Sequence, residues 1–253
     1  MLVGAQRGGR DRRCARARLP RAGLWALAVV IDLAAAGAGF RFPGLGRSAT
    51  TEWTISGAHF AERCQGFVLI ALGESIVVTG ARLAGLGSPS AAELAAFAIA
   101  FAGSAALWWI YFDRTAEDSS RRIEQSGDPG RLARDAFHRV HPLIVAGIVV
   151  SAAADEVVLA DPHRRGSLTV GWLALGGVAL YLAGHAAFKA VVWRVVAWPR
   201  WAGAAVALLL LLAAPHLGAL TVAVLALVVL VLVAMADGLH RLRDANPGYS
   251  SPC

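Results

Sequence analysis

Long apolar runs are the feature that most constrains how this chain can fold. A membrane-spanning helix needs about 20 predominantly apolar residues, and seven stretches approach that length: 22–40, 59–83, 91–112, 141–160, 168–188, 199–214 and 217–237. They are too long for barrel strands, and segments in lipid must satisfy their backbone hydrogen bonds internally, so each is predicted to be a helix. Only 16% of the residues are charged, against about 25% in a typical soluble domain. The sequence therefore predicts an all-α, polytopic transmembrane bundle of about seven spans, with the lipid bilayer as its main partner.

The last two predicted spans are nearly continuous in sequence. Residues 201–236 as a single helix would be about 54 Å long at 1.5 Å per residue, well beyond the thickness of a bilayer. Pro215 and Gly218 can interrupt that helix, which predicts a tight helical hairpin. A six-span arrangement, with one half of the hairpin re-entrant, stays open.

The positive charge of the chain follows a membrane topology rather than a nucleic-acid-binding pattern. The formal net charge is +7, but the basic residues lie between the apolar runs. Thirteen of them occupy connections 41–58, 113–140 and 189–200 and the C-terminal tail, whereas three occupy the alternate connections. Cytoplasmic loops are rich in Lys and Arg, so the C-terminus and the 113–140 connection are predicted to be cytoplasmic. No nucleic-acid partner is expected, and a homo-oligomer is left open.

The run at 59–80, HFAERCQGFVLIALGESIVVTG, carries charges inside an apolar helix. A charge near the middle of a membrane span costs several kcal/mol, so such residues usually face protein or a water-filled cavity. At about 100° per residue, His59, Arg63 and Glu74 share one helical face. Three glycines recur at every seventh position, a spacing that favours close helix packing: Gly66, Gly73 and Gly80.

This stretch resembles the signature of the low temperature requirement protein A (LtrA) family of bacterial membrane proteins. The family pattern, His-x-x-Glu-Arg followed by a Gly-Leu-Phe-like step and Ile-x-Leu-Gly-Glu-Ser-Ile, is matched by His59, Glu62, Arg63, Gly66, Phe67, Ile70, Leu72, Gly73, Glu74, Ser75 and Ile76. Residues 107–113, LWWIYFD, and 141–162 agree as well, and 24–33 agrees more weakly. The resemblance implies a multi-pass protein of the bacterial cytoplasmic (inner) membrane.

The resemblance also implies that the chain is N-terminally incomplete, because family members usually open with an acidic, Phe-rich helix that is missing here. We therefore divide the chain into an Arg-rich tail at 1–21, a transmembrane domain at 22–240 and a short cytoplasmic tail at 241–253. The seven Arg residues of the first tail oppose the charge-based topology. Three interpretations stay open: the tail flips or disorders the first span, it binds a partner, or it is not part of the native protein. We favour the last.

Four intramembrane carboxylates are candidate proton or cation sites. Glu74 and Asp32 lie near the middle of their spans, and Asp155 and Glu156 lie in the 141–160 run. The two adjacent acids point in different directions on a helix, so one is expected to face inward. The alternative for each carboxylate is that it forms an ion pair with a neighbouring helix and serves only to fix the packing.

Four further residues are candidate counter-charges or gates: His59, Glu62, Arg63 and His141. Arg63 or His59 could pair with Asp32 if the first two spans are neighbours. His138 and His141 could bind a metal, but Pro142 as a helix-initiating residue offers a simpler explanation. His185 is expected to be hydrogen-bonded across helices, and Asp237 to anchor its helix at the interface. No Cys-x-x-Cys pair and no phosphate loop is present, so we expect no metal and no cofactor.

The family resemblance names no reaction, so function rests on these residues. The leading hypothesis is a secondary transporter or ion-translocating protein that uses the intramembrane carboxylates. The alternative is a non-transporting structural or stress-response membrane protein whose buried charges are paired. An intramembrane enzyme ranks lowest, because no nucleophile–base pair stands out, and we expect no catalytic residues.

Overall fold

The computed structural model describes residues 23–25, 27–32, 34–35, 57–113 and 115–244. The chain forms two units, Met1–Trp53 and Thr54–Cys253, which are considered separately. In the first unit the described residues form a short apolar helix, Gly23–Asp32. The Arg-rich tail at 1–21 and the end of the C-terminal tail lie outside the described residues, so the predictions made for them stay predictions.

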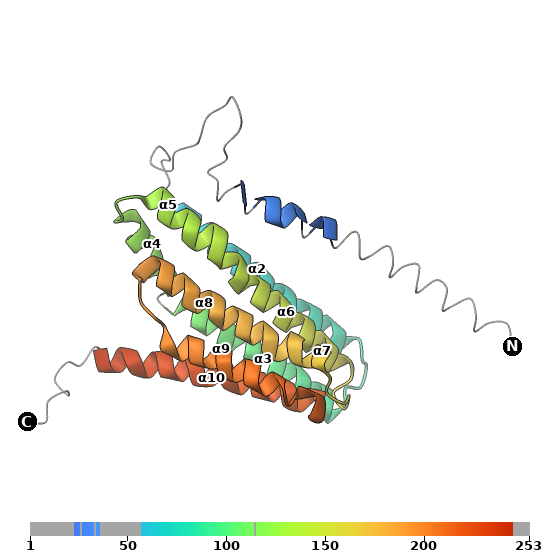
Figure 1. Cartoon of the computed structure of the whole chain (residues 1–253). Coiled ribbons are helices and arrows are strands. Elements are labelled where there is room, and N and C mark those ends of the chain that lie inside the picture. Colours follow the sequence, from blue (N-terminus) through green and yellow to red (C-terminus); the bar gives the residue numbers. More distant parts are fainter. Residues whose placement is uncertain (1–22, 26, 33, 36–56, 114, 245–253) are drawn as a thin grey trace, which may run out of the picture. The chain divides into compact units, whose positions relative to one another are not determined.

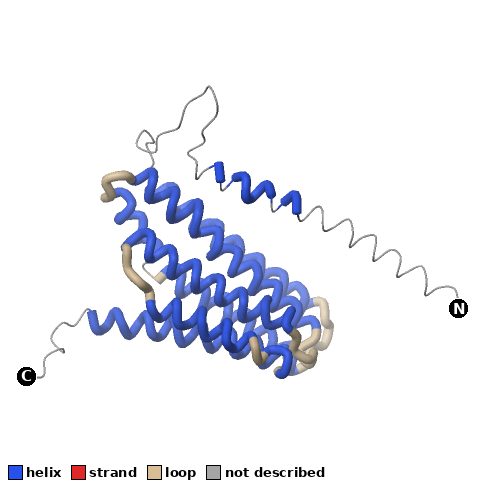
Figure 2. Tube along the Cα trace, viewed as in Figure 1, coloured by secondary structure: helices blue, strands red, loops and turns tan. Residues whose placement is uncertain are grey.

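The second unit is a bundle of helices that run side by side (Figure 1). Its described residues contain helices and turns, as Figure 2 shows by colour. The helical elements are α2 (Gly57–Ala84), α3 (Ala91–Phe112), α4 (Thr115–Glu124), α5 (Pro129–Ala133), η2 (Arg134–Val140), α6 (His141–Ala160), α7 (Leu168–Gly171), η3 (Trp172–Gly176), α8 (Gly177–Trp193), α9 (Trp198–Leu211), η4 (Ala214–His216) and α10 (Ala219–Asp244). The prediction of an all-α membrane bundle is confirmed.

Within the described part of the chain, five helical stretches are long and apolar enough to cross a membrane: Ala61–Ala84, Ala91–Phe112, Pro129–Ala160, Leu168–Trp193 and Ala219–Leu239. The predicted hairpin is also present, because α9 ends at Leu211 and α10 begins at Ala219. With 14 residues, α9 is about 21 Å long at 1.5 Å per residue, shorter than the hydrocarbon core. It packs between α8 and α10 rather than standing as a full span.

The connection predicted at 113–140 is largely helical. Ile123 and Ser119 of α4 are buried, and α4 packs against α2. Pro142 stands in the first turn of α6, as the sequence suggested, but α6 follows η2 without a break, so the helical stretch is continuous from Pro129 to Ala160. The wider π turn before Pro142, in which the His141 N–H bonds to the Ala136 carbonyl, accommodates a residue that lacks its own N–H.

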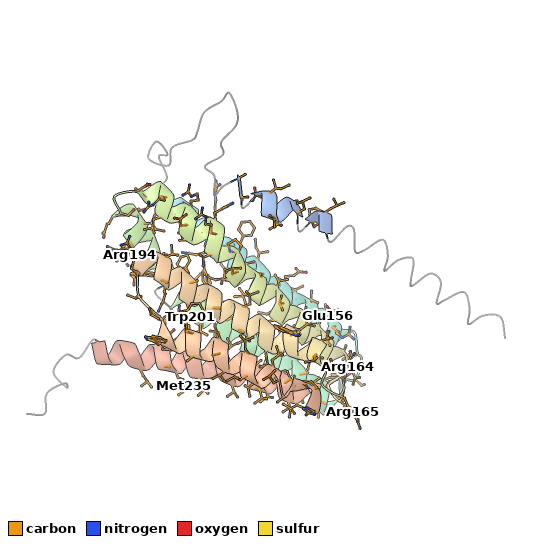
Figure 3. The ribbon with its side chains drawn as sticks, viewed as in Figure 1. Glu156, Arg164, Arg165, Arg194, Trp201 and Met235 are labelled. Carbon is orange, nitrogen blue, oxygen red and sulfur yellow. The ribbon has the colours of Figure 1, made fainter. Side chains whose placement is uncertain are left out.

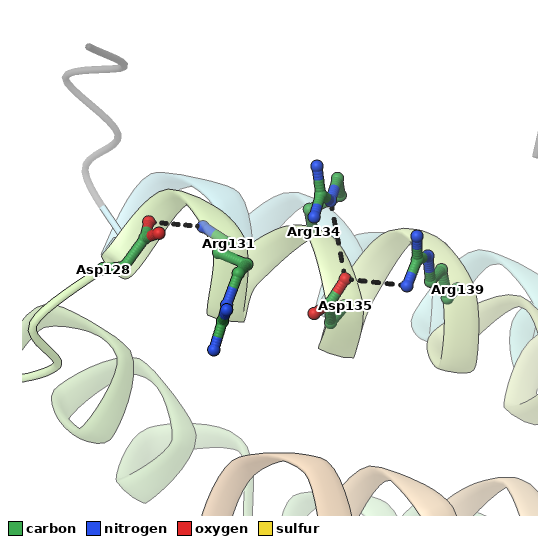
Figure 4. A network of polar contacts seen from close by, with 5 residues as sticks. All are labelled: Asp128, Arg131, Arg134, Asp135 and Arg139. Atoms are coloured by element: carbon green, nitrogen blue, oxygen red, sulfur yellow. Dashed lines mark hydrogen bonds and ion pairs between the residues drawn. The ribbon is translucent and has the colours of Figure 1, made fainter. Parts of the chain in front are cut away.

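Charged side chains form polar contacts along α5 and η2, the two elements that lead into α6 (Figure 4). Asp128 caps α5 by accepting a hydrogen bond from the backbone N–H of Arg131 at 2.9 Å. Asp135 pairs with Arg134 at 3.5 Å and with Arg139 at 3.2 Å. Such partly exposed pairs contribute at most about 1 kcal/mol, so the burial of the apolar helices carries the stability here.

Helices α6 and α8 approach each other closely. A Cβ atom added at Gly147 would lie 2.5 Å from the backbone nitrogen of Tyr181, and one at Gly177 would lie 2.7 Å from the Ser151 hydroxyl. Small residues let two backbones approach in this way. On α2, by contrast, a Cβ at Gly66 or Gly73 would meet no described atom within 4 Å. The packing role predicted for that glycine stripe stays a prediction.

Candidate functional site

A groove between α2 and α6 brings together two of the predicted carboxylates. The groove has a volume of about 550 Å³, and Glu74 of α2 and Glu156 of α6 both line it. Ser75 lies beside Glu74 in the same wall, which is otherwise formed by apolar side chains such as Phe67 and Val149. The two acids are 82 positions apart in sequence, and the packing of α2 against α6 places them in one cavity.

The positions of Glu74 and Glu156 along their helices determine how costly their charges are in a membrane. Glu74 lies in the middle of the span Ala61–Ala84, whereas Glu156 lies about one turn before the end of α6 at Ala160, toward the Arg164 end of the bundle (Figure 3). Both side chains are exposed on the described surface. A carboxylate at the depth of Glu74 is costly unless water, protein or a cation compensates it, so the groove combines an apolar wall with sites for positive charge.

Asp155 faces a different side of α6 from Glu156. It lines a cavity of about 30 Å³ inside the bundle, together with Ser151, Gly103 and Ala223 from three helices. Ser151 precedes Asp155 by one turn, so the two share a face, and the Ser151 hydroxyl is buried with no hydrogen-bond partner among the described residues. A cavity of this size holds a water molecule or two. The sequence predicted that one of the adjacent acids faces inward, and the structure assigns that position to Asp155.

The candidate gate residues are dispersed. His141 is 4% exposed and its Nε2 lies 3.0 Å from the Tyr111 hydroxyl of α3. Glu62 and Arg63 are exposed near the start of α2, and the side chain of His59 lies outside the described residues. Asp32 belongs to the first unit, so its pairing with Arg63 or His59 stays untested.

Sequence patterns did not predict a buried ion pair at the end of the bundle where α9 begins. Arg200 is one of the basic residues of the 189–200 connection, yet its side chain is only 3% exposed. Its Nε and Nη2 donate to Oδ2 of Asp237 on α10 at 2.9 and 2.8 Å. Its Nη1 lies 2.8 Å from Nδ1 of His185 on α8. Asp237 therefore pairs inside the bundle rather than anchoring at the interface, and the cross-helix bond expected for His185 is confirmed.

Two tyrosines complete this buried polar cluster. The ring centroids of Tyr111 and Tyr181 lie 5.5 and 5.2 Å from that of His185. The Tyr181 hydroxyl donates to the Leu107 carbonyl at 2.6 Å. An available signal was that Arg200 and Asp237 are opposite charges at the outer ends of two consecutive apolar runs, and a hairpin between the runs brings these ends together.

Comparisons with known proteins find one matching family and a related protein of similar sequence. The model of the family described as "Bacterial low temperature requirement A protein (LtrA)" matches residues 14–235. An uncharacterised protein of Rhizobium meliloti (strain 1021) is 32% identical over 177 residues. That alignment covers 68% of this chain and 42% of the relative, so the chain matches less than half of the relative's length. No solved structure matches the chain.

Proposed function

The chain belongs to the bacterial LtrA family of membrane proteins, and from that premise we propose that it is an ion-translocating protein or secondary transporter. The observation that carries this proposal is the α2–α6 groove, which is lined by both Glu74, in the middle of its span, and Glu156. Ionisable residues within spans commonly mark ion or proton pathways. The expected substrate class is a proton or a small cation, and the expected location is the cytoplasmic membrane with the C-terminus inside.

The two sides of α6 suggest how such a protein would work. Glu156 opens to the groove and Asp155 opens to the interior cavity, although the two residues are neighbours in sequence. A cation or proton held in the groove would therefore have to move past α6 to reach Asp155. We propose Glu74 and Glu156 as the primary site and Asp155 with Ser151 as the next site along the path.

The test is a flux measurement in proteoliposomes that contain the full chain. A pH or cation gradient is imposed, and flux is followed with an entrapped indicator dye for wild type, Glu74→Gln and Glu156→Gln. Glu93→Gln is the matched control, because Glu93 sits in the first turn of α3, away from the groove, and forms a capping box with Ser90. Gln supports the same box, so that variant should keep wild-type flux.

Loss of gradient-driven flux in the groove variants, with folding intact and the Glu93→Gln control active, supports the proposal. Absence of any flux in correctly folded wild-type protein overturns it. Turnover of a substrate without a gradient would point instead to an enzyme.

The second candidate is a structural or stress-response membrane protein with satisfied buried charges. The Arg200–Asp237–His185 cluster favours it, because each of these groups pairs with another within the bundle. In that case Glu74→Gln would change stability and no transport would be measurable in any variant.

A further inference from the structure

The hydrogen bond between Arg200 and His185 determines which ring nitrogen of His185 carries the proton. A guanidinium group can only donate hydrogen bonds. Because Nη1 of Arg200 lies 2.8 Å from Nδ1 of His185, Nδ1 must accept. The neutral ring then carries its proton on Nε2, and the histidine is a donor at that nitrogen.

That donor is buried without a protein acceptor. His185 is 1% exposed, and its Nε2 has no hydrogen-bond partner among the described residues. Leaving a buried donor unpaired costs about 1–3 kcal/mol. Native proteins usually satisfy such groups with the protein or with ordered water.

A small cavity beside the ring has the size and the polar lining for one water molecule. His185 lines a space of about 10 Å³ together with Gln65 of α2, Tyr111 of α3 and Ser119 of α4. A cavity of roughly this volume accommodates a single water, which needs two to four polar partners. The three polar side chains and the Nε2–H supply those partners, whereas the space is too small for a larger ligand.

We propose that this cavity is a binding site for one structural water, which accepts a hydrogen bond from His185 Nε2–H and bonds to Tyr111. Tyr111 already bonds to His141 on α6 at 3.0 Å. The water would complete a continuous polar chain from Asp237 through Arg200, His185 and Tyr111 to His141, which crosses five helices at one end of the bundle. The proposal is independent of the transport function proposed above.

Magic-angle-spinning NMR of the full chain in lipid bilayers tests the tautomer and the water together. Gly184-His185 is the only Gly-His dipeptide in the sequence, so ¹³C-carbonyl glycine combined with ¹⁵N-histidine identifies this residue without any mutation. The expected result is a protonated Nε2, an unprotonated Nδ1 and magnetisation transfer from water to the Nε2 proton. A proton on Nδ1, a doubly protonated ring, or no transfer from water would overturn the proposal.

Two tyrosine variants locate the water. Tyr111→Phe removes a cavity-lining hydroxyl, and the water-to-Nε2 transfer should fall while the tautomer is unchanged. Tyr181→Phe is the matched control, since its ring also contacts His185 but its hydroxyl is committed to the Leu107 carbonyl. Equal loss of transfer in both variants, or in neither, would contradict the assigned site. If either variant fails to fold, the wild-type spectrum alone still decides the proposal.

Discussion

Removing one partner of the Arg200–Asp237 pair should destabilise the bundle far more than removing a surface ion pair. Arg200→Met removes the guanidinium group that pairs with the Asp237 carboxylate, whose side chain is 11% exposed. It also removes the donor to His185. Breaking a buried pair from one side typically costs about 3–5 kcal/mol. The expected loss for Arg200→Met is therefore about 3–5 kcal/mol of the free energy of unfolding.

A double-mutant cycle isolates the interaction. Asp237→Leu alone should cost a similar amount, because it leaves the guanidinium buried. The double variant should recover about 2–3 kcal/mol relative to the sum of the singles, since apolar replacements of both partners leave no uncompensated charge. His185 still loses its donor, so full recovery is not expected.

The assay is reversible unfolding in mixed micelles, followed by tryptophan fluorescence as the fraction of denaturing detergent rises. The matched control cycle uses Asp135 and Arg139, whose side chains are 29% and 44% exposed. For such a pair at i,i+4 the expected coupling is about 0.3–0.5 kcal/mol. A coupling for Arg200 and Asp237 no larger than that of the surface pair would refute the reasoning.

Two further predictions concern helix packing, both read out by the same unfolding assay. Gly147→Ala should destabilise the bundle by about 1–3 kcal/mol, because its Cβ would lie within 2.7 Å of Tyr181 backbone atoms and α6 would have to move away from α8. Gly73→Ala is the control for this variant, and it should be neutral or stabilising by up to about 1 kcal/mol, because the space around Gly73 is open. A large loss of stability in Gly73→Ala would instead reveal a close packing partner for the predicted glycine stripe. Tyr181→Phe should cost about 0.5–1.5 kcal/mol by removing the buried hydrogen bond from its hydroxyl to the Leu107 carbonyl, and an unchanged unfolding midpoint would show that this bond contributes nothing.

The spans were predictable because the requirement for long apolar helices is local. The runs that became α3, α8 and α10 are visible as composition alone, and the break before α10 follows from Pro215 and Gly218. The prediction of structure from sequence was less accurate where contacts with neighbouring elements determine how a segment folds. The stretch at 113–140 looks like a charged loop, yet Ile123 is fully buried because α4 packs against α2.

The candidate site was predictable in its residues but not in its grouping. Helical geometry shows that Asp155 and Glu156 diverge, but not which of them faces inward; the position of α10 and α3 around α6 determines that. The Arg200–Asp237–His185 cluster depends on the hairpin between α9 and α10, which returns Asp237 to the end where Arg200 begins its helix. Such pairing is a property of three helices, whereas sequence patterns report one helix at a time.

The groove sets a physical condition that any function of this protein must meet. An acidic side chain at the centre of a span costs about 2.5–3.5 kcal/mol by insertion scales, and this cost applies to Glu74, whereas Glu156 lies near the end of α6, where the cost is smaller. For Glu74 alone the cost is already a sizeable part of the stability of a typical folded protein, about 5–15 kcal/mol. Glu74 and Glu156 line the same groove, so a single occupant that compensates both acids removes most of this cost. Water, a cation or a covering protein segment can do so, whereas an acyl chain cannot. The groove is therefore a place where water, positive charge or a polar protein segment must compensate Glu74, and both the proposed ion pathway and the structural alternative have to meet this condition.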